Sequence, residues 1–173
     1  MPNTTNFALP YPAATDPADV PADIQRLANA VDAALNPPIL QMTTSGSQTL
    51  TNGTVTKPAL VTTQAGSHGG TALTADAANN RIVVGQTAWY LISAVAGFDV
   101  AVSVQGRRLV MVYVGGVETL RVAPVTADSN IQLPVTGILR LGAATQLEMR
   151  VYQDSGVSVV LTGAALTVTQ LAL

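Results

Sequence analysis

The feature that most constrains the fold is an apolar run at residues 86–98, which contains the only tryptophan, Trp89, and one of the two phenylalanines, Phe98. The run follows Gly85 and pauses at Gly97. An apolar segment of this length and composition predicts a strand that is buried on both faces. Because large aromatic side chains dominate the burial energy of a core, we expect the rest of the domain to pack around this strand as its central element.

From residue 39 onward the sequence has the pattern of an all-β domain. Short segments rich in Val, Leu, Ile and Thr alternate with turns made of Gly, Asn and Asp, which is typical of a sandwich or barrel. The strongest turn signal is Gly115-Gly116, which predicts a two-residue hairpin between strands at residues 109–114 and 117–122. The first of these strands is apolar on both faces. We therefore expect one face to meet the core and the other to meet a partner subunit, with Met111, Val112 and Tyr113 divided between the two.

The remaining strands are expected on the same grounds of alternation and turn chemistry. They are predicted at residues 39–43, 48–51, 57–63, 81–84, 98–105, 137–141, 147–152, 157–162 and 164–171. Residues 71–80 are expected to form a loose connection, and residues 128–134 a loop or an edge segment. Near the C-terminus, residues 157–162 and 164–171 are predicted as two separate strands.

Residues 1–18 are predicted to form an extended arm, because four prolines bias their neighbours away from helix. Three apolar side chains, Phe7, Leu9 and Tyr11, alternate along this arm. Side chains spaced in this way suit a groove on another protein, so we predict that the arm docks onto a partner. A free terminus is the alternative interpretation.

Residues 19–36 are predicted to contain a short helix over about 20–35, with Asp19 as its N-cap. Ile24, Leu27 and Val31 recur on one narrow stripe, which is typical of a coiled-coil seam. Two heptads are marginal in isolation, because helix nucleation is costly, so the stripe is expected to meet equivalent helices or another protein. Packing against the chain's own β domain is the alternative.

The composition indicates self-association and excludes several classes of function. Charged residues make up 10% of the chain and hydrophobic residues 48%, whereas an average domain has about 25% charged residues. A monomer with so few charges would expose extensive apolar surface, so we expect an obligate oligomer. The net charge of −2 argues against nucleic-acid binding. The only basic dipeptide, Arg107-Arg108, is interpreted as a solvated hairpin end.

No membrane insertion or secretion is expected. The first residues carry no positively charged segment followed by an apolar core, and no run of about 18 apolar residues occurs in the chain. The chain has no cysteine, so a disulfide framework and a thiolate site are both excluded. Synthesis in a cytoplasm without export is the simplest interpretation.

The residues that commonly carry chemistry have simpler interpretations. His68 is the only histidine and lies between glycines in residues 66–70, where a solvated loop residue is expected rather than a metal ligand or receptor contact. Asp76, near Asn79 and Asn80, offers oxygen ligands for calcium, but turn chemistry explains these residues better. We therefore predict no catalytic site, no metal and no cofactor, and a protein that is not an enzyme.

Residues 40–173 resemble the jelly-roll heads of the complement globular-head and tumour necrosis factor (TNF) families. The resemblance is carried by residues 85–94 (GQTAWYLISA), by the hairpin at 114–116 (VGG) and by residues 139–153 (LRLGAATQLEMRVYQ). Ala143 stands where these families usually have Asp, so any role of that acid is absent. The resemblance implies a jelly-roll β-sandwich that forms compact homotrimers. On this basis Trp89, Tyr90, Met111, Val112 and Tyr113 are the residues predicted for the trimer interface or the core.

The N-terminal segment resembles the leader of small tail or fibre proteins of actinobacterial phages. The carriers are residues 9–12 (LPYP) and 15–28 (TDPADVPADIQRLA). This resemblance implies attachment to a virion, through an anchor that includes Phe7, Leu9, Tyr11, Ile24, Leu27 and Val31. It divides the chain into a docking arm at 1–18, a helix segment at 19–36 and a jelly-roll head at 39–173.

Taken with the first resemblance, the leader predicts a structural virion protein of a bacteriophage. We expect a homotrimeric tail-fibre or baseplate component that is assembled in the host cytoplasm and contributes to host recognition. Two alternatives stay open: a capsid decoration or head-fibre protein, and a head domain that binds host cell-surface glycans.

Overall fold

The structure is a computed structural model that describes residues 20–64, 70–99, 106–123, 125–126 and 131–171. The predicted arm, including Phe7, Leu9 and Tyr11, lies outside the described residues, as do Asp19 and His68. The chain divides into two compact units, one of which contains the helix and the other residues 38–170.

The first unit contains α1 (Val20–Leu35), the single α-helix of the described residues. Asp23 lies in its first turn and forms an ion pair with Arg26, with 2.7 Å between the carboxylate and guanidinium atoms. A carboxylate near the helix N-terminus also interacts favourably with the helix dipole. The helix therefore spans the range that its apolar spacing predicts.

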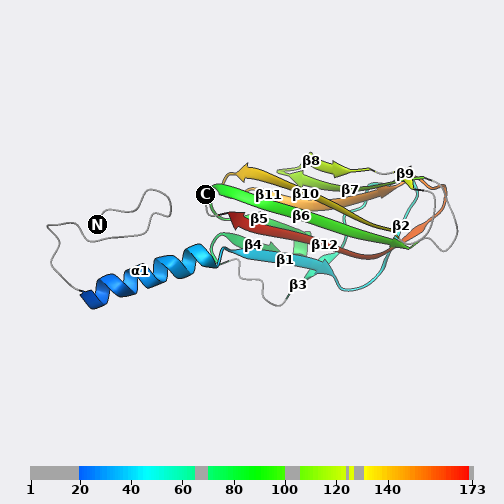
Figure 1. The fold of residues 1–173 in the computed structure, drawn as a ribbon. Helices are drawn as coiled ribbons and strands as arrows, with labels where there is room; N and C mark the ends of the chain where they lie inside the picture. The colour runs from blue at the N-terminus through cyan, green and yellow to red at the C-terminus, as the bar shows by residue number, and fades with distance from the viewer. Residues whose placement is uncertain (1–19, 65–69, 100–105, 124, 127–130, 172–173) are drawn as a thin grey trace. The chain divides into compact units, whose positions relative to one another are not determined.

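The second unit is a two-layer sandwich of antiparallel strands (Figure 1). The first sheet has the order β10-β6-β12-β1-β3, with β2 also paired to β12, and the second has the order β4-β5-β11-β7-β8, with β9 paired to β7. The strands are β1 (Ile39–Thr44), β2 (Gln48–Leu50), β3 (Leu60–Thr63), β4 (Leu73–Asp76), β5 (Arg81–Val84), β6 (Ala88–Asp99), β7 (Gly106–Val114), β8 (Val117–Val122), β9 (Val125–Thr126), β10 (Ile131–Leu141), β11 (Gln146–Gln153) and β12 (Val159–Leu171). This arrangement is an all-β jelly roll, as the sequence predicts.

Strands from opposite ends of the sandwich unit lie side by side. β1, the first strand, pairs with β12, the last, in a register that places Leu40 opposite Val168 and Met42 opposite Leu166. These four side chains are buried and belong to the hydrophobic core between the sheets. Since such pairing joins residues far apart in sequence, closing the fold requires both ends of the unit.

The predicted hairpin is confirmed at Gly115 and Gly116, which connect β7 to β8. Both glycines have positive φ angles, 58° and 87°. Residues other than glycine adopt these angles at a cost, and a two-residue turn that matches the twist of the strands requires them at both positions. The glycine pair therefore determines the register of β7 and β8 at this end of the sheet.

The strand of the apolar run differs from the sequence prediction in two ways. β6 is buried on one face only: Tyr90, Ile92, Ala94, Ala96 and Phe98 face the core, and the alternate residues do not. β6 is also next to the terminal strand β10, while β12 holds a more central place in the sheet. Gly97 does not interrupt the strand, because β6 continues through Phe98 to Asp99.

Three further boundaries differ from the predictions. β10 is one strand of eleven residues that includes Pro134, and proline is tolerated there because β10 is a terminal strand with one free edge. β12 is also one continuous strand. Buried residues alternate with less buried ones along it, but the alternation shifts by one residue between Leu161 and Ala164, which are both buried. Residues 71–80 include β4 and a short 3₁₀ turn instead of a loose connection.

Candidate functional site

The outer face of the first sheet exposes large apolar side chains. On β6 and β10, Trp89 lies opposite Arg140 and Leu91 lies opposite Ile138. Trp89 is 42% exposed and Ile138 is 55% exposed, and Val61 of β3 and Val160 of β12 are exposed as well. The only charged residues in all the strands of this sheet are Asp99 and Arg140. A surface with this composition is typical of an interface, because isolated domains seldom expose contiguous apolar area without ionic groups around it.

Trp89 and Tyr90 are adjacent in sequence and face opposite sides of the sheet. The ring of Tyr90 is buried in the core, and its hydroxyl donates a hydrogen bond of 2.9 Å to the backbone oxygen of Gln86. Burial raises the pKa of this hydroxyl. Tyr90 is therefore a core residue, while Trp89 lies on the outer surface, contrary to the prediction that both faces of this strand are covered by its own domain.

The outer face of the second sheet carries a network of ion pairs. Glu148 of β11 pairs with the amine of Lys57 at 2.8 Å and with the guanidinium of Arg150 at 2.9 Å. The Arg150 guanidinium also lies 4.1 Å from the centre of the Tyr113 ring. Burial by itself would raise the pKa of Glu148, but the hydrogen bonds from Lys57 and Arg150 outweigh it, so the pKa lies below its ordinary value.

This network corrects the prediction that the outer face of β7 meets a partner. Met111 lies between Arg150 of β11 and Arg121 of β8 in the strand registers, and it is only 2% exposed. Arginine stems can cover apolar surface while their charged ends stay in water. Val112 belongs to the core, and Tyr113 is half-buried. The chain itself thus covers the apolar side chains of β7, and neither Met111 nor Val112 offers exposed surface to a partner.

Arg107 and Arg108 are not a solvated pair. Arg107 is exposed and pairs with Asp154 at 2.7 Å, and the hydrogen bonds from its backbone and side chain lower the pKa of Asp154. Arg108 is 1% exposed, and its burial lowers the pKa of its guanidinium. A buried cation cannot contact an external phosphate, so the dipeptide does not form a basic patch.

Beside Arg108 in the strand register lies Gln153, a buried amide whose structural role the sequence did not indicate. Its nitrogen donates to the backbone oxygens of Leu50 and Val157 at 3.2 and 2.8 Å. Its oxygen accepts from the amide and hydroxyl of Ser155 at 2.9 and 2.6 Å. The Gln153 side chain therefore ties β2 and the turn after β11 together.

The structure supports turn chemistry at Asp76. Its carboxylate accepts hydrogen bonds from the backbone and side chain of Asn79 and pairs with Arg81 at 2.7 Å. The Asn79 hydrogen bond is the main cause of a lowered pKa for Asp76, with Arg81 contributing next. Asn80 adopts a left-handed conformation that ends the 3₁₀ turn. The carboxylate oxygens of Asp76 are thus engaged within the chain, while the side-chain oxygen of Asn80 is buried without a hydrogen-bond partner among the described residues.

Neither a metal centre nor a membrane-spanning helix is found in the described parts of the chain. No group of three or more Asp, Glu or His side chains there is arranged to hold a metal ion. Of the described helical residues, none belong to a helix long and apolar enough to cross a bilayer.

The predicted stripe of α1 is partly exposed. Ile24 is 61% exposed, Leu27 is exposed and Val31 is half-buried. The helix also carries the Asp23–Arg26 pair and a hydrogen bond of 2.9 Å between the side chains of Gln25 and Asn29. Apolar residues at this spacing leave a surface on the helix that a partner helix or another protein can cover.

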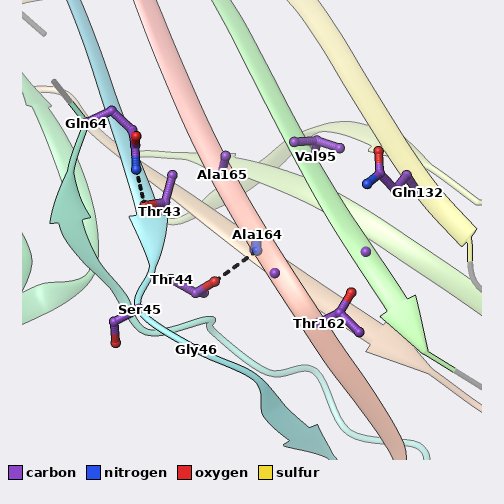
Figure 2. A pocket seen from close by; sticks show the side chains of 12 residues that line it. Thr43, Thr44, Ser45, Gly46, Gln64, Val95, Gln132, Thr162, Ala164 and Ala165 are labelled. Atoms are coloured by element: carbon purple, nitrogen blue, oxygen red, sulfur yellow. Dashed lines mark hydrogen bonds between the residues drawn. The ribbon is translucent and has the colours of Figure 1, made fainter. Parts of the chain in front are cut away.

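A hollow of about 560 Å³ lies on the outer face of the first sheet, where β10, β6, β12 and β1 run side by side (Figure 2). Its floor is made of small residues, including Gly97, Gly163 and Ala165. Six uncharged polar side chains line it: Thr43, Thr44, Ser45, Gln64, Gln132 and Thr162. No sequence signal indicated this hollow, because it is assembled from four strands.

The comparisons with known proteins support the fold. No model of a protein family matches the chain, and no curated protein matches it significantly. Two similar solved structures are the Eiger TNF of S. frugiperda (TM-score 0.55, 12% identity, covering 78% of this chain and 93% of that one) and murine APRIL at pH 5.0 (TM-score 0.57, 16% identity, covering 78% of this chain and 99% of that one). At these identities the similarity concerns the fold alone. The chain therefore has a jelly-roll head domain with a TNF-like fold.

Proposed function

We propose that this chain is a non-enzymatic structural protein whose jelly-roll head assembles into a homotrimer. The observation that carries the proposal is the outer face of the first sheet, which exposes Trp89 and Ile138 and has only two charged residues in its strands. Burying apolar surface contributes about 25 cal/mol per Å², and few charges have to be desolvated on this face. The resemblance to trimeric jelly-roll heads supports three copies over two.

We propose further that the trimer is a virion component of a bacteriophage, anchored through its N-terminal segment. This part of the proposal rests on the resemblance of residues 9–28 to the leaders of phage tail and fibre proteins. The exposed Ile24 and Leu27 of α1 are available for contact with other virion proteins or with equivalent helices. A tail-fibre or baseplate position is favoured over capsid decoration, and assembly would take place in the host cytoplasm.

The test measures the mass of the purified chain by light scattering at micromolar concentration. The expected result is three times the chain mass of 17.7 kDa, persisting on dilution. A monomer under these conditions would remove the basis for the trimer.

A second test addresses the anchor. A truncated chain that starts at Ile39 retains the compact unit of residues 38–170 except for its first residue, and it is expected to fold and trimerise. It is expected to be missing from particles when it replaces the full chain during phage assembly. Normal incorporation of the truncated chain would contradict the anchor, and the full chain in the same complementation serves as the control.

A further inference from the structure

The hollow on the first sheet has the dimensions of a ligand site. Its volume of about 560 Å³ lies within the range of about 300–1,000 Å³ that is usual for small-molecule pockets. Figure 2 shows Gln132 and Thr162 on one side of the hollow and Thr43, Ser45 and Gln64 on the other. The lining residues therefore surround a concave surface from four neighbouring strands, the turn after β1 and the residue that follows β3.

The backbone of β12 creates the depression. Elsewhere in this strand a single residue separates one buried residue from the next. Between the buried residues Leu161 and Ala164 there are two, Thr162 and Gly163. Across the sheet, a Cβ atom on Gly97 would lie 2.6 Å from the hydroxyl of Thr162. A side chain at Gly97 would therefore require the Thr162 side chain to move, and the present surface is sunken where Gly97, Gly163 and Ala165 meet.

Part of the polar lining is held in place by the chain. The Thr44 hydroxyl accepts a hydrogen bond of 3.1 Å from the backbone amide of Ala164 at the irregular position of β12. The amide nitrogen of Gln64 donates to the Thr43 hydroxyl at 2.8 Å. Both contacts are drawn in Figure 2. Since these side chains are already fixed, a ligand would lose less affinity to the ordering of the site.

The lining also determines the class of ligand. Its polar side chains are hydroxyls and amides, and it contains no charged residue. Among the described residues, the side chains of Ser45, Gln132 and Thr162 form no hydrogen bond within the chain, so their donors and acceptors face water. A carboxylate or an ammonium group would lose its hydration here without gaining a counter-charge. A neutral ligand that both donates and accepts hydrogen bonds has no ionic hydration to lose and can replace its bonds to water with bonds to the lining.

We infer that the hollow binds a neutral saccharide. Sugar hydroxyls match the amides of Gln64 and Gln132 and the hydroxyls around them, because each can both donate and accept. Gly97, Gly163 and Ala165 have no side chain larger than a methyl group, so they leave room for the C–H face of a pyranose ring. The site goes beyond the proposed structural role, since it would let the head recognise a carbohydrate wherever the protein is located.

The hollow and the Trp89–Ile138 part of the apolar face lie at different ends of the same sheet. Trp89 lies eight residues before Gly97 on β6, which corresponds to roughly 26 Å at the strand rise of about 3.3 Å per residue. Ile138 lies opposite Leu91, on the Trp89 side. An interface centred on Trp89 and Ile138 therefore leaves the hollow at the far end of these strands.

The experiment titrates the full chain with methyl α-D-glucopyranoside, methyl β-D-galactopyranoside and N-acetyl-D-glucosamine, with saturation-transfer NMR as the readout. D-Glucuronate and D-glucosamine serve as charged counterparts. We expect saturable binding of at least one neutral sugar, with a Kd of about 1 mM, and at least tenfold weaker binding of the charged sugars. No saturable binding of any neutral sugar, or equal binding of the charged ones, would overturn the inference.

Two variants locate the site. Ala165→Leu places a larger side chain in the hollow and is expected to weaken binding at least tenfold. Thr169→Leu is the matched control, because Thr169 lies on the same strand outside the hollow lining, and it should bind as the unmodified chain does. Gln132→Ala is expected to weaken binding several-fold without changing the melting temperature. Unchanged binding by Ala165→Leu would place the sugar elsewhere and contradict the assignment.

The mass of each sample is measured alongside binding, which separates this inference from the proposed trimer. Sugar binding by a monomer would support the site and contradict the trimer. If the assembled chain fails to bind and dissociated Trp89→Asp chains bind, a second copy covers the hollow in the assembly, and the saccharide site is overturned.

Discussion

The two sheets of the sandwich present opposite kinds of surface to their surroundings. Every longer strand of the second sheet contains at least one charged residue, as in the network of Lys57, Glu148 and Arg150. The strands of the first sheet contain only Asp99 and Arg140, and they expose Trp89 and Ile138. Both sheets bury their inner faces in one core, so the core does not account for the difference.

The difference shows what each outer face is suited for. Paired charges interact well with water and resist association, because covering them costs hydration free energy. An uncharged face with exposed aromatic and aliphatic groups gains free energy when it is covered. The comparison therefore predicts that substitutions have different consequences in the core, on the first sheet and on the second sheet.

The largest effect is expected from a charge in the shared core. Val112→Asp introduces a carboxylate at a fully buried position between the sheets, where it has no partner. The cost of burying such a group is at least several kcal/mol, which is a large fraction of the stability of a domain. We expect this variant to lose its folded structure, as measured by circular dichroism and thermal melting. A cooperative melt close to that of the unmodified chain would contradict the assignment of Val112 to the core.

The next effect separates assembly from folding. Trp89→Asp places a charge on the outer face of the first sheet, where the side chain is exposed in the single chain. We expect the fold to persist and the mass to fall to that of one chain, because the charge would be buried in the interface. The matched control is Val117→Asp on β8 of the second sheet, which should leave the mass unchanged. Dissociation by Val117→Asp but not by Trp89→Asp would reverse the comparison.

The sequence predicted the strands with clear alternation and clear turns. The hairpin at Gly115 and Gly116 and the strand predicted at residues 147–152 are confirmed, the latter as β11 with Leu147, Met149 and Val151 in the core. These elements are determined by local chemistry, either the backbone freedom of glycine or a period of two along one strand. The jelly-roll fold followed from the order of such segments and from the resemblance.

The sequence could not assign the surroundings of an outward-facing side chain. An apolar residue on the second face of a strand is covered by a partner or by its own chain, and only the strand order distinguishes the two. Met111 is covered through β8 and β11, whereas Trp89 on β6 is not. The long strand β10 was missed for a similar reason, since Pro134 is compatible with a strand only at the edge of a sheet. The hollow likewise depends on strands that are distant in sequence.

A moderate effect is expected from the ion-pair network of the second sheet. The pKa of Glu148 is lowered in the folded chain, so the unfolded chain takes up a proton more readily. The stabilisation that the ionised Glu148 contributes is fully present above the ordinary glutamate pKa of 4.5. It is lost as the pH falls through the lower pKa that Glu148 has in the folded chain. Glu148→Gln should reduce stability at pH 7 by about 1 to 2 kcal/mol. Below pH 4.5 the free energy of unfolding of this variant should fall less steeply than that of the unmodified chain, as measured by denaturant unfolding across pH. A variant with the same acid sensitivity as the unmodified chain would show that Glu148 is not the group responsible.

The smallest effect is expected from the exposed ion pair of the same sheet. Arg121 and Glu118 on β8 are 3.5 Å apart, and both side chains are more exposed than Glu148. Exposed pairs contribute between about 0 and 1 kcal/mol and are screened by salt. However, the stem of Arg121 also flanks Met111. Glu118→Gln should therefore change the free energy of unfolding by less than about 0.5 kcal/mol, and Arg121→Ala by more, because it uncovers Met111. Denaturant unfolding at low and high salt measures both. If both variants give the same small change, the arginine stem does not cover Met111, and the explanation for the burial of β7 on the charged face fails.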